Sequence, residues 1–310
     1  MGIFSEIALW SFIAALLVAM IAVWCQYSRL KRALAVTATT RHAGLKAIYV
    51  HAGPYRIFAR VSIDGEERVS IDGEDMPHIP AILVHGLVIS SRYMEPLAEA
   101  LRHHVTVMAP DLPGFGESDK PPHALTLVEL ADALHAWLRA CEIPRAILIG
   151  NSFGCQILVE LAIRHPEVID RLVLQGPTTD PKARYLLFQI WRDFLNQRRE
   201  PGNVGRIARI DYAKAGLFRA FATMKILIRD RIEEKLSLIE APVLVVHGTR
   251  DPVAPRDWAR QVSTTLPHGR FVAIEGGTHT LNYAYPNEMA EAILPFLLAD
   301  REQLLQGVEA

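Results

Sequence analysis

Five short, almost uninterrupted apolar runs constrain the fold of this chain more than any other feature of its sequence: AILV, VTVMA, AILI, RLVL and VLVV. Strands of a parallel sheet have this composition because helices cover both faces of the sheet. Helical patterns stand between the runs. The clearest is Thr126–Ala140, where apolar residues recur at i, i+3, i+4 and i+7 behind a capping Thr126. The sequence therefore predicts an α/β fold with a mostly parallel eight-stranded sheet flanked by helices.

Eight segments in all have the composition and the flanking turn residues of strands. The chain has 310 residues and is half hydrophobic, which suffices for one large α/β domain, and we expect that domain to span residues 46–310. The expected strands are Lys46–Val50, Tyr55–Ile63, Ala81–Val84, Val105–Ala109, Ala146–Ile149, Arg171–Leu174, Val243–Val246 and Arg270–Ile274.

The alternation of strands and helices is interrupted once, by nearly seventy residues between Leu174 and Val243. One helix is enough to connect two neighbouring parallel strands, so the excess at about 178–236 predicts a helical cap inserted over the carboxyl edge of the sheet. We expect the large apolar residues of this cap to be buried, either against the sheet or around an apolar substrate pocket. They are Tyr185, Leu186, Leu187, Phe188, Ile190, Trp191, Phe194, Leu217, Phe218, Phe221 and Met224.

The segment GNSFG at residues 150–154 carries the strongest chemical signal. It follows the AILI run and precedes a helical pattern that ends before Pro166. This is the context of the G-x-S-x-G nucleophile elbow, in which a serine lies on a strained turn between a strand and a helix. A serine hydroxyl is a weak nucleophile that must be open to a base and a substrate. We therefore predict Ser152 as the nucleophile, flanked by glycines because side chains there would collide with the neighbouring strand or helix.

An acid and a histidine are expected after the serine, in that order. The VLVV strand runs into HGTRDP, which places Asp251 on a loop beyond the carboxyl end of that strand. The last predicted strand is followed by EGGTH, which places His279 on a neighbouring loop. Open α/β sheets bind ligands at this edge. We predict that His279 takes the proton of Ser152 and that Asp251 orients the imidazole.

Two backbone N–H groups are expected to form an oxyanion hole. One belongs to Phe153, the residue after the nucleophile, and the other to Leu87, in the VHGL segment that ends an early buried strand. His85 and His247 each precede a glycine at a strand end, where we expect structural roles.

Together these residues resemble the α/β-hydrolase superfamily, and the resemblance extends from residue 46 to 300. Two further segments match it, DLPGFGES at 111–118 and a closing helix at Pro286–Leu298. The resemblance implies a cofactor-free hydrolase with a helical cap after the sixth strand. Cys155 stands where many relatives have a second glycine, and Leu87-Val88 replaces a glycine often found near the first oxyanion donor. Both departures can narrow the pocket.

The serine at the elbow limits the reaction class, because haloalkane dehalogenases and epoxide hydrolases of this fold have an aspartate there. The leading hypothesis is a serine hydrolase that acts on carboxylic esters with an apolar, lipid-like acyl group. A carbon–carbon bond hydrolase of ring-fission products stays open, since the elbows of those enzymes have a similar Gly-Asn-Ser sequence. A serine perhydrolase and a non-catalytic binding protein on the same scaffold are further alternatives.

The N-terminal segment differs from the rest of the chain, since residues 7–28 carry no charge and consist mainly of Ala, Leu, Ile, Val and Trp. A helix of about 20 apolar residues crosses the hydrocarbon core of a bilayer. Trp10, Trp24 and Tyr27 stand near the two ends, where amphipathic rings favour the membrane interface. We predict a transmembrane anchor within residues 1–32.

Two kinds of processing compete with a retained anchor. A cleaved secretory signal needs a positively charged start, and Glu6 is the one charged residue before the apolar stretch. Lipoprotein processing at Cys25 needs a small residue before the cysteine, and Trp24 occupies that position. We expect a retained anchor, followed by a short linker at residues 33–45.

The charges near the anchor predict its orientation, because positive residues favour the cytoplasmic side of a membrane. We therefore expect a cytoplasmic catalytic domain. The net charge of −1 and the scattered cysteines argue against a nucleic-acid-binding stripe, a disulfide framework or a zinc site, and Cys141 and Cys155 are expected to be buried thiols. The positive residues after the anchor are Arg29, Lys31, Arg32, Arg41 and Lys46.

Overall fold

The computed structural model describes residues 21, 44–62, 79–200 and 202–306. Contacts within the chain divide it into two units, residues 1–40 and 41–310, and the fold below is that of the second unit. The predicted anchor lies outside the described residues except for Ile21, and so does the predicted linker up to residue 43. Among the described helices, none combines the length and the apolar character needed to cross a bilayer.

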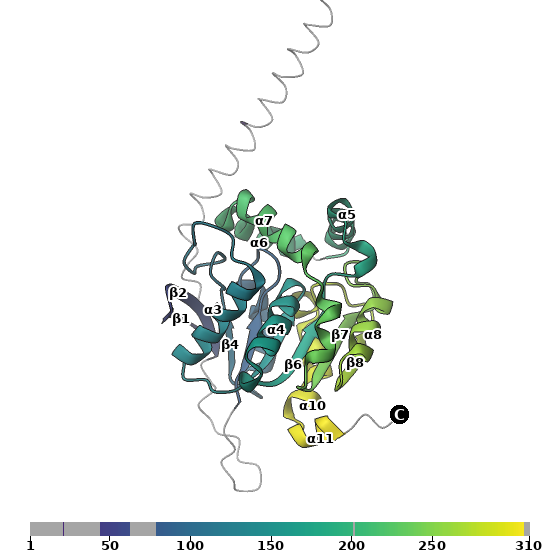
Figure 1. Ribbon diagram of the computed structural model, residues 1–310. Coiled ribbons are helices and arrows are strands. Elements are labelled where there is room, and N and C mark those ends of the chain that lie inside the picture. The colour runs from purple at the N-terminus through teal and green to yellow at the C-terminus, as the bar shows by residue number, and fades with distance from the viewer. Residues whose placement is uncertain (1–20, 22–43, 63–78, 201, 307–310) are drawn as a thin grey trace, which may run out of the picture. The chain divides into compact units, whose positions relative to one another are not determined.

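An eight-stranded sheet forms the centre of the domain (Figure 1). Its strand order is β1-β2-β4-β3-β5-β6-β7-β8. The pairs β1–β2 and β2–β4 are antiparallel and the other five pairs are parallel, which confirms the predicted mostly parallel sheet. Each strand overlaps one expected from the sequence: β1 (Leu45–Ala52), β2 (Tyr55–Ser62), β3 (Ala81–Val84), β4 (Val107–Pro110), β5 (Ala146–Asn151), β6 (Ile169–Gln175), β7 (Val243–Gly248) and β8 (Gly269–Ile274).

Helices cover both faces of the sheet, and this explains the continuous apolar runs. Every residue of β3, β5, β6 and β7 is buried. Side chains alternate between the faces, so Leu148 of β5 packs in one apolar cluster and Ile147 and Ile149 in the other. The first cluster includes α3 (Leu127–Ala140), α4 (Phe153–Arg164) and α8 (Arg256–Thr265), and the second includes α2 (Glu95–Leu101), α9 (Leu281–Ala284), α10 (Pro286–Leu298) and α11 (Arg301–Gln306).

The helix expected at Thr126–Ala140 begins as its sequence indicates. The Glu129 N–H donates to Thr126 Oγ1 at 3.2 Å, and the Thr126 N–H donates to the Glu129 carboxylate at 2.8 Å. This reciprocal capping box satisfies two N–H groups that a helix start otherwise leaves without partners. The apolar stripe expected for this helix is buried, and α10 has the bounds expected for the closing helix. The residues of the stripe are Leu127, Leu130, Ala131, Leu134, Trp137 and Leu138.

Three α-helices of the described residues lie between β6 and β7, at the upper end of the domain in Figure 1: α5 (Leu186–Gln197), α6 (Gly202–Ala215) and α7 (Leu217–Arg229). The expectation that the large apolar residues of this cap are buried is wrong for nine of the eleven. Five of the nine lie in α5, whose buried residues are the polar Gln189 and Asn196. An amphipathic pattern identifies an apolar face but not the direction in which it points. The exposed residues are Tyr185, Leu187, Phe188, Ile190, Trp191, Phe194, Leu217, Phe218 and Phe221.

Candidate active site

Ser152 lies on the turn between β5 and α4, as the elbow motif predicts. Its backbone has φ 55° and ψ −117°, a strained conformation that residues other than glycine rarely adopt. The flanking glycines are required because space is lacking. A Cβ on Gly154 would lie 2.5 Å from the Val84 carbonyl oxygen of β3, and a Cβ on Gly150 would lie 2.9 Å from the carbonyl carbon of Gly154 in α4. The strand and the helix therefore approach closely enough to fix the turn that carries Ser152.

The loops after β7 and β8 bring the predicted acid and histidine together. His279 Nδ1 lies 2.7 Å from Asp251 Oδ2, and both side chains are buried. The other oxygen, Asp251 Oδ1, accepts from the N–H groups of Val253 at 2.7 Å and Ala254 at 3.0 Å. Both carboxylate oxygens are thus fixed. Because Asp251 accepts the Nδ1 proton, Nε2 is the ring nitrogen that can act as a base.

Burial and charge have opposite effects on the pKa of His279. Burial lowers this pKa, but the carboxylates of Asp251, Glu200 and Asp193 raise it by more, and the pKa lies above its ordinary value. The surroundings therefore favour the imidazolium, which is the form that arises when the histidine takes a proton from a nucleophile.

Three residues that position His279 were not predicted from the sequence: Gly176, Asn151 and Gln175. Gly176 has φ 57°, and a Cβ there would lie 2.9 Å from His279 Nδ1, so the imidazole packs on this glycine. Asn151 Nδ2 donates to Gln175 Oε1 at 2.5 Å, and Gln175 Nε2 donates to the His279 carbonyl oxygen at 2.7 Å. The available signal was the pair of polar residues at the carboxyl ends of two neighbouring buried strands.

The predicted oxyanion donors lie on two segments that meet at the serine. A Cβ on Gly86 would lie 3.3 Å from Ser152 Cβ, and Leu87 is the next residue. Phe153 is the first residue of α4, where an N–H has no partner within the helix. Among the hydrogen bonds of the described residues, none uses the N–H of Leu87 or of Phe153. Both N–H groups can therefore donate to a substrate oxygen.

His85 holds the loop that contains Leu87. The Leu112 N–H donates to His85 Nε2 at 3.1 Å, so the ring proton is on Nδ1, which lies 2.9 Å from the Gly86 carbonyl oxygen. Burial lowers the pKa of His85, which keeps the ring in this neutral form. Val88, in the same loop, has φ 57° and carries the backbone strain that a glycine would avoid.

Other histidines lie apart from this site. His247, at the end of β7, is buried, and burial lowers its pKa. His135, His165 and Glu167 hold three potential metal-ligand atoms within 4.8 Å of one another. These three are on α3 and beyond the last residue of α4, whereas Ser152 directly precedes the first residue of α4. They do not belong to the site that contains the serine.

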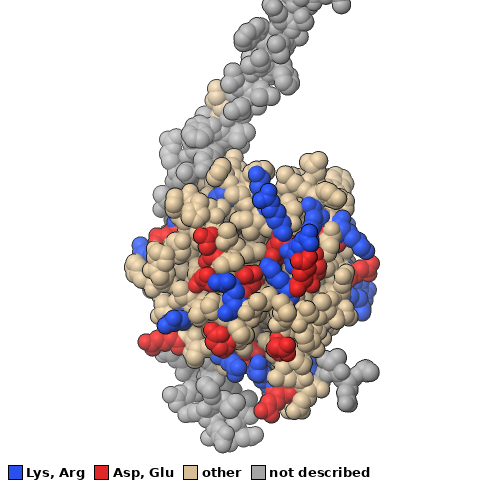
Figure 2. Space-filling view, viewed as in Figure 1, with Lys and Arg blue, Asp and Glu red and all other residues tan. Residues whose placement is uncertain are grey.

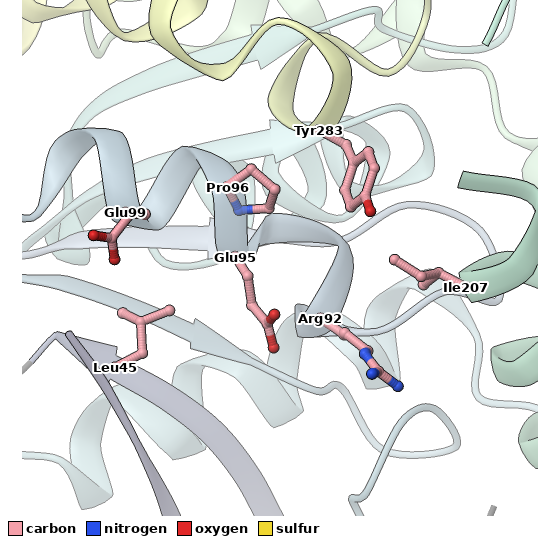
Figure 3. Close-up of a pocket in the computed structure, with 7 residues that line it drawn as sticks. All are labelled: Leu45, Arg92, Glu95, Pro96, Glu99, Ile207 and Tyr283. Carbon is pink, nitrogen blue, oxygen red and sulfur yellow. The ribbon is translucent and has the colours of Figure 1, made fainter. Parts of the chain in front are cut away.

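A cavity of about 510 Å³ has a lining that does not include the serine, and Figure 3 shows the residues that form it. Glu95 and Glu99 of α2 line it together with Ile207 of α6 and Tyr283 of α9. Its lining contains neither Ser152 nor the other residues predicted for catalysis. Glu95 also forms an ion pair with Arg60. The cavity is therefore distinct from the candidate active site.

Known proteins are similar to this chain in sequence and in fold. A family model described as "Alpha/beta hydrolase family" matches residues 81–292, which include the serine, the acid and the histidine. A pimeloyl-[acyl-carrier protein] methyl ester esterase of Xanthomonas campestris is 25% identical over 251 residues, 72% of this chain and 96% of the esterase. A 2-hydroxymuconate semialdehyde hydrolase of a Pseudomonas species is 33% identical over 204 residues, 56% of this chain and 66% of that protein.

A solved structure of a membrane phospholipase A, described as a bacterial virulence factor, is also similar. It is 25% identical, with a TM-score of 0.69 over 92% of this chain and 97% of the phospholipase. The described sheet, the elbow and these similarities agree. The chain belongs to the alpha/beta hydrolase family and is a hydrolase.

Proposed function

We propose that this hydrolase cleaves carboxylic esters with apolar acyl groups. Ser152 is the nucleophile, His279 is the base, and the Asp251 carboxylate orients the imidazole of His279. The observation that carries the proposal is the 2.7 Å contact between His279 Nδ1 and Asp251 Oδ2, on loops at the edge of the sheet where the Ser152 elbow ends β5. A base oriented by a carboxylate, on a loop at the sheet edge where the serine lies, is the arrangement that acyl transfer requires.

The reaction follows from the positions of these groups. Ser152 Oγ attacks the ester carbonyl carbon while His279 Nε2 takes the hydroxyl proton. The N–H groups of Leu87 and Phe153 donate to the oxygen that becomes negative, and each such donor contributes about 3–4 kcal/mol to the transition state. The imidazolium then protonates the departing alkoxide, which leaves as an alcohol and gives an acyl-enzyme. Water attacks the acyl-enzyme by the same steps in reverse order, releasing the acid and restoring the serine.

Labelling with a fluorophosphonate tests the catalytic assignment. We expect the folded protein to take up the label on Ser152, and Ser152→Ala to take up none. Ser263→Ala is a matched control, since Ser263 lies on α8 and its hydroxyl donates to the Arg260 carbonyl oxygen. A folded wild-type protein without label would disprove the serine hydrolase.

Two observations support an apolar acyl group. The cap exposes nine large apolar side chains, among them Leu187 at 81% and Phe218 at 83% exposure. Exposed apolar surface of this kind is typical of lipid or partner binding. In addition, one of the similar structures is a membrane phospholipase A. A panel of p-nitrophenyl esters of increasing chain length tests this substrate class, and we expect kcat/KM to rise with chain length.

The proposal includes attachment to a membrane through residues 7–28, with the hydrolase domain in the cytoplasm. Residues 7–28 carry no charge, and one of the similar structures, which covers 92% of this chain, is a membrane phospholipase A. Reporter fusions to each end test the orientation. A C-terminal reporter that is active only outside the cytoplasm would disprove it.

A carbon–carbon bond hydrolase is the second candidate, and the 33% identity to the 2-hydroxymuconate semialdehyde hydrolase favours it. The discriminating result would be inactivity on every ester of the panel combined with turnover of a ring-fission dienoate. A perhydrolase would instead show peroxide-dependent peracid formation. A binding protein on the same scaffold would take up no fluorophosphonate.

A further inference from the structure

Helix α5 contacts both loops that carry the proposed catalytic acid and base. Arg192 donates to the Val253 carbonyl oxygen at 3.2 Å, and Arg199 donates to the Arg250 carbonyl oxygen at 2.7 Å. Both acceptors flank the proposed acid. The His279 N–H donates to Asn196 Oδ1 at 3.4 Å. The cap helix and the turn that follows it are therefore hydrogen-bonded to the two loops.

Glu200 makes the most extensive of these contacts. It follows α5 on a turn in which its N–H donates to the Asn196 carbonyl oxygen at 3.1 Å. Its Oε2 accepts from the Thr278 hydroxyl at 3.0 Å and from the Thr280 hydroxyl, and its Oε1 accepts from the Thr280 N–H at 3.2 Å. The carboxylate thus binds the residues on both sides of His279.

The two threonines are buried, Thr278 at 0% and Thr280 at 4% exposure, so their hydroxyls depend on partners within the protein. Hydrogen bonds to an ionised carboxylate are stronger than those between neutral groups. On the opposite side, Gln175 and Asn151 donate to the His279 carbonyl oxygen at 2.7 and 3.3 Å. The amides of Gln175 and Asn151 therefore hold the histidine loop from the sheet, and the Asn196 amide and the Glu200 carboxylate hold it from the cap.

We propose that Glu200 is a positioning residue of this hydrolase, and that its carboxylate fixes the backbone of the His279 loop and so aligns the imidazole with Ser152. The proposal rests on the proposed function of Ser152 and His279. Glu200 touches no reacting atom and acts through Thr278 and Thr280. Its charge has a second effect, because it contributes to the raised pKa of His279.

Two substitutions separate geometry from charge. Glu200→Ala removes all three hydrogen bonds, and we expect kcat to fall on the order of tenfold or more with a smaller change in KM, since misplacement of a catalytic group by about 1 Å has such effects. Glu200→Gln keeps a carbonyl acceptor for the Thr280 N–H and an amide that can donate to the threonine hydroxyls. It should recover most of kcat.

Glu200→Gln should also change the pH profile. Loss of the negative charge destabilises the imidazolium, so the pKa of His279 falls and the acid limb of kcat/KM moves to lower pH. Glu234→Gln is the matched control, because Glu234 is exposed and paired with Arg231 on the surface of the same region. It makes the same change of charge and should leave kcat and the acid limb unchanged.

A double-mutant cycle with Thr280→Val tests whether Glu200 influences kcat through its hydrogen bond to the Thr280 hydroxyl. If Glu200 acts through Thr280, the effects of Glu200→Ala and Thr280→Val on kcat are not additive. A folded Glu200→Ala with wild-type kcat would overturn the proposal. If that variant does not fold, a folded Thr280→Val with wild-type kcat overturns it instead, because this substitution removes the hydroxyl through which the carboxylate is proposed to act. Ester hydrolysis that persists in Ser152→Ala would disprove the proposed function itself, a result that the Glu200 variants alone cannot produce.

Discussion

Gly154 shows how little space surrounds the proposed nucleophile. Its Cα approaches the end of β3, and a Cβ would lie 2.5 Å from the Val84 carbonyl oxygen and 2.8 Å from that of His85. Backbone atoms cannot move away as a flexible side chain does. The strand, the turn and the helix would therefore have to shift together to accept even a methyl group.

We expect Gly154→Ala to lower the free energy of unfolding by about 1–3 kcal/mol, as overpacking does, and to lower kcat as well. Gly205→Ala is the matched control, because Gly205 lies within α6 and a Cβ there meets nothing within 4 Å. It should raise the free energy of unfolding by roughly 0.5–1 kcal/mol. Urea denaturation measures the free energy of unfolding of both variants, and equal effects of the two substitutions would contradict the steric explanation.

Asp211 provides a pH-dependent test at a single residue. It is buried on α6, accepts from the Ser90 hydroxyl at 2.7 Å, and has its pKa raised from 3.8 to about 6, chiefly by burial. A raised pKa in the folded state means that Asp211 contributes stability below about pH 4, which is lost as the pH rises through about 6.

Asp211→Asn keeps an acceptor for Ser90 and never becomes charged. We expect this variant to match the wild type near pH 4 and to exceed its free energy of unfolding by up to about 3 kcal/mol near pH 8, from a pKa shift of about two units. Urea denaturation at several pH values measures the difference. A difference that stays constant with pH would show that burial of the charge is not the cause.

The sequence was sufficient to predict the three proposed catalytic residues. It was not sufficient to predict the residues that fix their positions by hydrogen bonds. Ser152, Asp251 and His279 follow strand ends in a recognisable order, so their places were predictable. Gln175 and Glu200 reach His279 from 104 and 79 positions away in the sequence, and no local pattern indicates such a contact. Only the folded chain brings a cap residue against the histidine loop.

At the scale of elements, the strands were predictable because burial on both faces leaves a continuous apolar run, whichever helices cover the sheet. The cap was less predictable. Its helices have apolar faces, but α5 directs Asn196 toward the active-site loops and exposes Trp191 at 55% and Phe194 at 47%. Hydrogen bonds to those loops, rather than apolar burial, orient this helix.

The exposed apolar side chains of α5 and α7 should therefore contribute little to folding. We expect Leu187→Ser and Phe218→Ser each to change the free energy of unfolding by less than about 0.5 kcal/mol. Leu227→Ala, on the buried side of α7 at 4% exposure, is the contrasting control and should cost about 2–5 kcal/mol. The two serine variants should also raise KM for long-chain esters. Large losses of stability in them would show that these faces are covered in the folded protein.

At the scale of the whole molecule, positive charge is concentrated in the cap region. Residues 178–236 contain 13 Lys and Arg against 7 Asp and Glu, so this region is +6 in a chain whose net charge is −1. In Figure 2, basic and uncharged side chains predominate at the upper end of the view, over α5 and α7. A positive region next to exposed apolar side chains suits a surface of anionic lipids.

We expect the detergent-solubilised full chain to hydrolyse an ester in anionic mixed micelles with a lower apparent KM than in zwitterionic ones. Each basic residue near an anionic surface contributes about 1 kcal/mol of attraction, which salt weakens. The difference between the two micelles should therefore shrink as sodium chloride rises from about 0.05 to 0.5 M, across which the screening length shortens. An apparent KM independent of lipid charge and of salt would contradict this expectation.

The contacts of Glu200 have a consequence for the exchange of caps between related hydrolases. Chimeras that transplant a cap to alter substrate preference treat the cap as a module that ends at its two connections to the sheet. Here the module also supplies acceptors to the histidine loop, Asn196 and Glu200. A donor cap that lacks acceptors at these two places would give a folded but slow enzyme, and restoring the carboxylate would be the first repair to make.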